Sequence, residues 1–114
     1  QAYGADYRYT GRVNKALPVP PLLEPVHAWA REAIDQRLNA LLLNWYDGPK
    51  HHIGPHHDDT RDMIPGAPIV TVSFGEARTF RLTRGAGPAK QTRDFLADSG
   101  AVFVIPFATN AGWK

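Results

Sequence analysis

The sequence predicts a mainly β protein with one helix near its N-terminus, an antiparallel sandwich or barrel of the jelly-roll type. One segment with helical periodicity is followed by five or more short segments rich in β-branched and aromatic residues. Turn signals separate these segments at close spacing, whereas a doubly wound parallel sheet would interleave helices with its strands. The 114 residues are enough for one hydrophobic core, so we expect a single domain over residues 1–114.

The N-terminal third of the sequence predicts a short strand followed by the helix. The strand-like piece is YRYTG at 7–11, and the proline-rich LPVPP at 17–21 then imposes a rigid turn. From 21 to 38, apolar residues recur at mostly three- to five-residue steps between polar residues, which indicates an amphipathic helix. The helix is expected to begin near Glu24 or Pro25, because proline is tolerated in the first helical turn.

The middle of the chain predicts a buried strand that leads into a histidine-rich loop. LNALLLNWY at 38–46 is an apolar run of the kind found in strands that are buried on both faces. The glycines and prolines of DGPKHHIGPHHDD at 47–59 then interrupt regular structure. This loop holds four of the five histidines, and His27 in the helix is expected to be a surface or packing residue.

The C-terminal half predicts four strands. PIVTVSFG at 68–75 and ARTFRLTR at 77–84 are expected to form a hairpin through a tight connection at 75–76. GAGPAKQ, which follows, is expected to be a loose basic loop. TRDFLA at 92–97 and GAVFVIPF at 100–107 are two further strands with a turn between them.

The composition limits the kinds of site that the chain can build. It contains no cysteine, which excludes disulfides and thiolate metal sites, so any metal must be bound by imidazole and carboxylate groups. No apolar run approaches the ~20 residues that span a bilayer, so no membrane partner is expected. The absence of cysteine favours the cytoplasm, or the nucleus if the organism is a eukaryote.

Basic residues are concentrated in one stretch, although the net charge is only +2. Residues 78–93 contain five basic residues and no acid: Arg78, Arg81, Arg84, Lys90 and Arg93. This stretch predicts a basic patch that contacts nucleic acid, and a solvated charged face is the alternative.

The histidine loop contains the pattern His-x-Asp twice, as His56 with Asp58 and as His57 with Asp59. In an extended chain successive side chains point to opposite faces, so only one pair can face the interior of a barrel. An imidazole and a carboxylate, joined by a second histidine, form the 2-His-1-carboxylate triad that holds Fe(II). The spacing does not choose between the two pairs, and a solvated polar loop or a zinc site are alternatives.

Several segments around this loop closely resemble AlkB-type oxygenases. They are NWYDG at 44–48, IGPHHDD at 53–59 and APIVTVSFGEARTFRL at 67–82, and YGADYRYTG at 3–11 with LPVPPLL at 17–23 is similar to the stretch before that family's helix. The motifs follow the family's order over nearly the whole chain. The resemblance implies a double-stranded β-helix, or jelly-roll, that is incomplete at its C-terminus.

The resemblance also implies roles for the loop residues. The family places its first iron ligand two residues after the Ile-Gly dipeptide, which selects His56 and Asp58 as the catalytic iron ligands. Asp59 then matches an acidic residue that contacts substrate, holds an arginine or orients the loop. His57 is expected to point away from the iron.

Other matching positions imply the co-substrate and substrate sites. Asn44 and Tyr46 match residues that hydrogen-bond 2-oxoglutarate, and they are expected two residues apart on one face of a strand. A polar end of a buried strand is the alternative. Tyr7, Tyr9 and Thr10 match the segment that lines the base pocket, where aromatic rings stack on a nucleobase. Plain core tyrosines are the alternative there.

The sequence departs from the family after its last strand. A second histidine ligand is expected just beyond FATNAGWK at 107–114, followed by arginines that bind 2-oxoglutarate, and none of these is present. Either the sequence stops short of the ligand or the protein is an inactive remnant. We expect the chain to be part of a longer protein, and we expect the final strands of the domain to be missing from this sequence.

Taken together, the resemblance implies an Fe(II)- and 2-oxoglutarate-dependent dioxygenase that demethylates alkylated bases in DNA or RNA and acts as a monomer. A first alternative is a catalytically inactive jelly-roll module that binds single-stranded nucleic acid through its tyrosines and the basic stretch at 78–93. A second is an oxygenase that acts on a protein or a small molecule. The sequence does not distinguish DNA from RNA.

Overall fold

The computed structural model describes all residues from 1 to 114, and they form two compact units. The first unit comprises Gln1–Ile53 and Asp58–Ala67, and the second comprises Gly54–His57 and Pro68–Lys114. The chain contains eight strands, two α-helices and one 3-10 helix, which confirms the prediction of a mainly β protein. No helix among them has the length and apolar character that crossing a membrane requires. The single domain stays a prediction.

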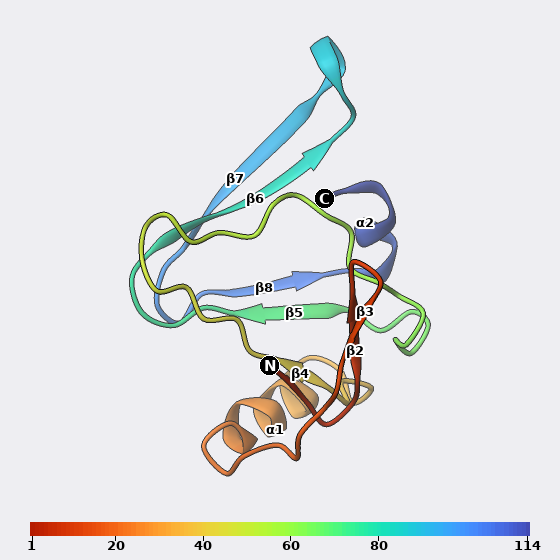
Figure 1. Ribbon diagram of the computed structural model, residues 1–114, viewed down its shortest axis with the longest axis vertical. Helices are drawn as coiled ribbons and strands as arrows, with labels where there is room; N and C mark the ends of the chain where they lie inside the picture. Colours follow the sequence, from red (N-terminus) through yellow and green to blue (C-terminus); the bar gives the residue numbers. More distant parts are fainter. The chain divides into compact units, whose positions relative to one another are not determined.

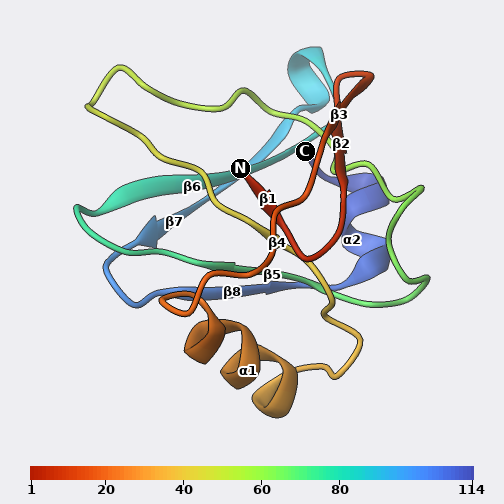
Figure 2. The ribbon, with the colours of Figure 1, turned by 60° about the horizontal axis from the view of Figure 1, so that its bottom comes forward.

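The four short strands of the first unit form two antiparallel pairs (Figures 1 and 2). The pairs are β1 (Ala2–Tyr3) with β4 (Leu41–Leu42), and β2 (Tyr7–Tyr9) with β3 (Arg12–Asn14). Thr10 and Gly11 connect β2 to β3 with φ angles of 47° and 78°, and a type I′ hairpin turn needs positive φ at both positions. The sequence predicts β2 but misses β3, because all three residues of β3 are exposed and show no apolar alternation.

The prediction of a strand at 38–46 that is buried on both faces is wrong. β4 covers only Leu41–Leu42, and beyond it Leu43 and Trp45 are 45% and 82% exposed. β4 pairs with β1 only, so it is not the central strand of a sheet, the position in which strands are usually buried on both faces.

Helix α1 (Glu24–Ala33) lies within the segment predicted to be helical and is shorter than it. It begins at Glu24 with Pro25 in its first turn, and it buries Ala30. Beyond its end, the Asp35 carboxylate accepts the backbone N–H of Arg37 at 2.9 Å. Such side-chain bonds compete with helical backbone hydrogen bonds, which explains why the helix does not reach residue 38.

The second unit is built on one long antiparallel hairpin. Its ladders are β5 (Ile69–Val72) with β8 (Val102–Ile105), and β6 (Arg78–Arg84) with β7 (Gln91–Ala97). Figure 1 shows β6 and β7 extending away from β5 and β8 to a turn that contains η1 (Gly87–Ala89).

A bulge joins the two ladders of this hairpin. Five residues, 73–77, separate β5 from β6, whereas four residues, 98–101, separate β7 from β8. The Ser73 N–H donates to the Ala101 carbonyl at 2.9 Å, and the Gly100 N–H donates to the Ser73 carbonyl at 2.7 Å. These bonds keep the arms together across the extra residue, which shifts the register by one.

The prediction of a hairpin between 68–75 and 77–84 is wrong. β5 and β6 follow each other along one arm of the long hairpin, and β7 and β8 form the other arm. Gly75 has a φ of 94°, yet the chain reverses at Gly85 and Gly87, whose φ angles are 77° and 55°. The GAGPAKQ segment, predicted to be a loose loop, is this reversal. The strands predicted at 92–97 and 100–107 are present as β7 and β8, also on one arm.

Aromatic rings and the C-terminal residues pack against β6. Phe80 and Phe95 oppose each other across β6 and β7, and both contact Phe103 on β8, with ring centroids 4.6 and 6.1 Å apart. Helix α2 (Phe107–Gly112) follows β8, and Thr83 and Lys114 then exchange two backbone hydrogen bonds of 2.8 and 2.9 Å. β6 is therefore hydrogen-bonded to β7 along one edge and to Lys114 at Thr83 on the other.

Candidate active site

The two proposed iron ligands lie in a loop without regular structure. Residues 51–59 contain no helix or strand, so the strand alternation that would separate the two His-x-Asp pairs onto opposite faces does not apply. His56 belongs to the second unit and Asp58 to the first.

His56 is oriented by a hydrogen bond to its own loop. Its Nδ1 lies 2.7 Å from the Gly54 carbonyl oxygen. A carbonyl can only accept, so Nδ1 carries the proton and donates, which leaves the lone pair of the neutral ring on Nε2. Metal-binding histidines commonly use one ring nitrogen for the metal and the other for such a bond, so the His56 ring suits a ligand role.

His57 is directed to a different partner. Its Nδ1 lies 2.5 Å from the carbonyl oxygen of Asn110, a residue of α2 that is 8% exposed. The bond anchors the loop of residues 54–57 to α2 in the second unit. The expectation that His57 points away from iron stays a prediction.

Asp58 receives a hydrogen bond from the hairpin formed by β2 and β3. The Tyr7 hydroxyl donates to Asp58 Oδ1 at 3.1 Å. Burial raises the pKa of Tyr7 above its usual value, and the negative charge of Asp58 raises it further. Tyr7 therefore remains a protonated donor at neutral pH. The sequence singled out both residues but gave no sign that they touch.

Asp59 is paired with a nearby arginine. Arg61 donates its backbone N–H and its Nε to Asp59 Oδ1 at 3.0 and 2.9 Å, and its Nη2 bonds the other carboxylate oxygen. These bonds lower the pKa of Asp59 to about 2. The carboxylate is therefore ionised, and its contact with substrate stays a prediction.

Asn44 and Tyr46 lie beyond the end of β4 and are exposed. They do not share the face of a strand, because β4 ends at Leu42. Their binding of 2-oxoglutarate stays a prediction that rests on the resemblance.

The tyrosines proposed for the base pocket both lie on β2, and Thr10 lies in its turn. Residues two apart on a strand share a face, so Tyr7 and Tyr9 project on the same side. A role of this face in stacking a base stays a prediction.

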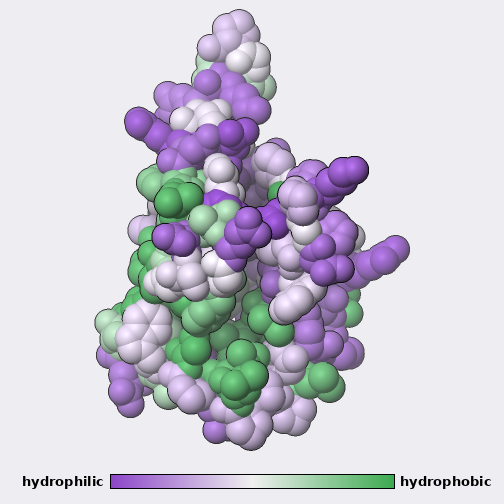
Figure 3. All heavy atoms as spheres, turned by 90° about the vertical axis from the view of Figure 1, so that its left-hand side faces the viewer, coloured by the Kyte–Doolittle hydropathy of each residue, from purple (hydrophilic) through white to green (hydrophobic).

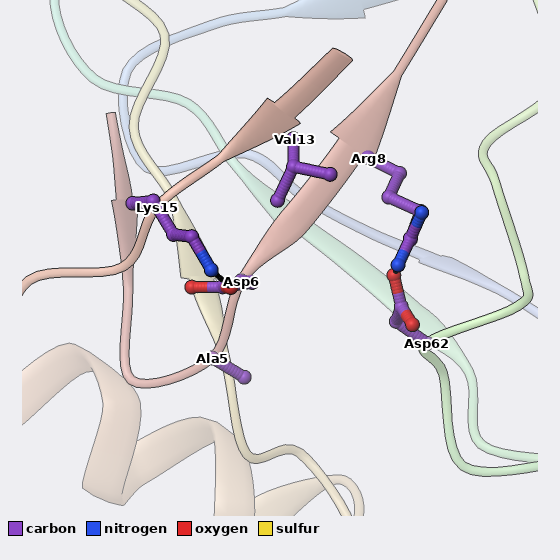
Figure 4. Close-up of a pocket in the computed structure, with 6 residues that line it drawn as sticks. All are labelled: Ala5, Asp6, Arg8, Val13, Lys15 and Asp62. Atoms are coloured by element: carbon purple, nitrogen blue, oxygen red, sulfur yellow. Dashed lines mark hydrogen bonds and ion pairs between the residues drawn. The ribbon is translucent and has the colours of Figure 1, made fainter. Parts of the chain in front are cut away.

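Sequence reasoning missed an open cavity beside the same strand. It has a volume of about 350 Å³ and is lined by Ala5, Asp6, Arg8, Val13, Lys15 and Asp62 (Figure 4). Arg8 Nε bonds Asp62 at 2.6 Å, and Lys15 Nζ bonds Asp6 at 2.8 Å. The Arg8 pair joins residues 54 positions apart, so no local motif could have revealed it.

The donor types fit iron, although they are incomplete in number. An imidazole and a carboxylate are two of the three protein ligands of a facial triad. No group of three or more histidine, cysteine, aspartate or glutamate side chains in the chain is placed to hold a metal ion. His56 and Asp58 would therefore supply two ligands.

The predicted basic stretch forms much of the β6–β7 hairpin. Figure 3 shows hydrophilic side chains on the projecting part of this hairpin below its tip, and the tip itself is mostly pale. Arg81 is paired with Asp94 at 2.7 Å, and Arg84 lies over the Trp113 ring at 5.3 Å. The hairpin thus carries a concentration of positive charge, and Asp94 on the neighbouring strand neutralises the share that comes from Arg81.

The chain matches one family profile and several known proteins. The family profile described as the 2OG-Fe(II) oxygenase superfamily matches residues 1–114. The DNA oxidative demethylase ALKBH2 of Homo sapiens is 33% identical over 117 residues, which cover 96% of this chain and 44% of the relative. ALKBH2 of Mus musculus is 35% identical over 117 residues, with 96% and 48% covered. The mouse alpha-ketoglutarate-dependent dioxygenase alkB homolog 3 is 28% identical over 102 residues, with 82% and 35% covered. The chain spans less than half the length of these relatives.

Proposed function

The chain belongs to the 2OG-Fe(II) oxygenase superfamily as an AlkB-like member, and we propose that the protein is a dioxygenase that oxidatively demethylates alkylated bases in nucleic acid. The observation that carries this proposal is the His-x-Asp loop inside a chain that the family profile matches along its whole length. DNA is the favoured substrate, because the relatives in human and mouse are named DNA oxidative demethylases. RNA is the second choice.

We assign the metal to His56 and Asp58 and the co-substrate to Asn44 and Tyr46. Bound Fe(II) with 2-oxoglutarate would supply the oxidation of a methyl group by dioxygen. The His56 ring presents Nε2 because Nδ1 is bonded to the Gly54 carbonyl, and Tyr7 holds the carboxylate of Asp58. The antiparallel strands β5 to β8 would form part of a jelly-roll that supports these groups.

The substrate base is assigned to the hairpin of β2 and β3. Tyr7 and Tyr9 would stack on the base, with Thr10 at the end of the strand. Asp59, kept ionised by Arg61, would lie on the substrate side of the loop. The protein would act as a monomer.

The test is turnover of a methylated oligonucleotide by the intact protein with Fe(II) and 2-oxoglutarate. We expect release of succinate and formaldehyde, and we expect His56→Ala and Asp58→Ala each to abolish it. His52→Ala is the matched control, because this loop histidine bonds the nearby Lys50 carbonyl and has no proposed role. Turnover that survives His56→Ala or Asp58→Ala would contradict the ligand assignment.

The basic β6–β7 hairpin favours a second candidate, a catalytically inactive module that binds nucleic acid. Salt-sensitive binding that is unaffected by iron, 2-oxoglutarate or His56→Ala would support this alternative. Turnover of a methylated peptide in place of the oligonucleotide would instead indicate a protein substrate.

A further inference from the structure

The Tyr7 hydroxyl links the β2–β3 hairpin to a proposed iron ligand through a hydrogen bond. It donates to Asp58 Oδ1 at 3.1 Å, across 51 positions of sequence, and both residues are half-buried. Stacking on a base would use the face of the ring, whereas this bond uses the hydroxyl. The two functions of Tyr7 are therefore chemically separable.

We propose that Tyr7 is a positioning residue for Asp58, whose hydroxyl fixes the direction of the carboxylate that binds the metal. This inference rests on the proposed function, because it assumes that Asp58 is an iron ligand. A carboxylate that is bonded through one oxygen cannot rotate freely about its Cβ–Cγ bond. Its other oxygen is then held in one direction, as the outer partners of metal ligands commonly require.

The hairpin is itself held in place, which a positioning role demands. Arg8, the residue after Tyr7, bonds Asp62 at 2.6 Å, so β2 contacts the segment of residues 58–62 at two points. On the other side, Asn14 Nδ2 donates to the Tyr7 carbonyl at 3.3 Å and lies opposite Tyr7 in the β2–β3 register. The Tyr7 backbone is thus fixed from β3, and its side chain is directed to Asp58.

The test removes the hydroxyl and keeps the ring. Tyr7→Phe in the intact protein is expected to weaken the binding of Mn(II), measured by calorimetry with 2-oxoglutarate present, by about 10- to 100-fold. Tyr3→Phe is the matched control, because Tyr3 lies on β1 and has no proposed contact with the site. Its Mn(II) affinity should equal that of the wild-type protein.

The outcomes separate this inference from the proposed function. Equal Mn(II) affinity in Tyr7→Phe and the wild-type protein would overturn the positioning role and leave the ligand assignment intact. An equal loss in Tyr3→Phe and Tyr7→Phe would also overturn it, since the effect would then be general. Failure of the wild-type protein to bind Mn(II) at all would remove both the inference and the proposed function.

Discussion

Two aspartates of the chain bind the arginine two positions further on in the same way. Arg37 donates its backbone N–H to Asp35 at 2.9 Å, and Arg61 does so to Asp59 at 3.0 Å, with guanidinium bonds in both cases. Each arginine lowers the pKa of its aspartate to about 2. Short Asp-x-Arg segments of this kind fix a turn locally. Arg37 in addition donates to the carbonyls of Pro65 and Gly66, which ties a distant segment to the end of α1.

Replacing Arg37 should therefore be visible in the titration of Asp35. In Arg37→Ala we expect the pKa of Asp35 to rise from about 2 towards 3.8, because the hydrogen bonds to its ionised form are removed. A lowered folded-state pKa stabilises the protein above pH 3.8, and this contribution disappears as the pH falls through about 2. The side-chain carboxyl signal in an NMR titration measures the change. Asp94, paired with Arg81, is the internal control and should keep its lowered pKa.

The hairpins show which elements a sequence can specify and which it cannot. The β-branched and aromatic runs of β5 to β8 predict strands at the right positions, because this signal is local. Their pairing does not follow from it, since Gly75, Gly85 and Gly87 all adopt positive φ and only the last two lie at the reversal. The apolar run at 38–46 leads to a wrong prediction of burial for a related reason. Burial depends on which distant segments pack against the run, and the run itself does not specify them.

Two glycines of the first unit should differ in their sensitivity to alanine. Gly4 and Gly11 have φ angles of 80° and 78°, so a side chain is strained at both. A Cβ at Gly4 would also lie 2.8 Å from the Asn39 carbonyl oxygen, whereas nothing lies within 4 Å at Gly11. We expect Gly11→Ala to lower the free energy of unfolding by about 1 kcal/mol and Gly4→Ala to lower it further.

Chemical denaturation measures both glycine effects. Gly112→Ala is the control, because Gly112 lies in α2 without positive φ and with open space around it. It should leave the stability unchanged or raise it slightly. Equal losses in Gly4→Ala and Gly11→Ala would show that the close approach to Asn39 has no energetic consequence.

Over the whole chain, features made of contiguous residues could be predicted from the sequence, and contacts between distant residues could not. The histidine loop and the basic stretch stand out because their residues are contiguous in sequence. Contacts between distant residues, such as Tyr7 with Asp58 and Arg8 with Asp62, have no sequence signal and emerge only from the fold. The role of Tyr7 as a hydrogen-bond donor was missed for that reason, although the residue itself was singled out.

The basic hairpin should make nucleic-acid binding depend on salt. We expect Lys90→Ala and Arg93→Ala in the intact protein each to weaken binding to duplex DNA. Each should also reduce the slope of log affinity against log salt by about 0.9 for every phosphate that is no longer neutralised. Fluorescence anisotropy at several salt concentrations measures this slope. Arg31→Ala on α1 is the control. An unchanged slope in both hairpin variants would place the nucleic acid elsewhere.

The bulge between the two ladders determines where this hairpin tolerates a change in chain length. A residue inserted in β6 ahead of Phe80 would send Phe80 and the rest of the strand's side chains to the opposite face and separate Phe80 from Phe103. A residue inserted at 73–77 would only enlarge a joint that already holds an unequal number of residues on its two sides. Insertions and deletions among natural variants of this protein should therefore gather at that joint and at the glycine-rich reversal, while both ladders keep a constant length.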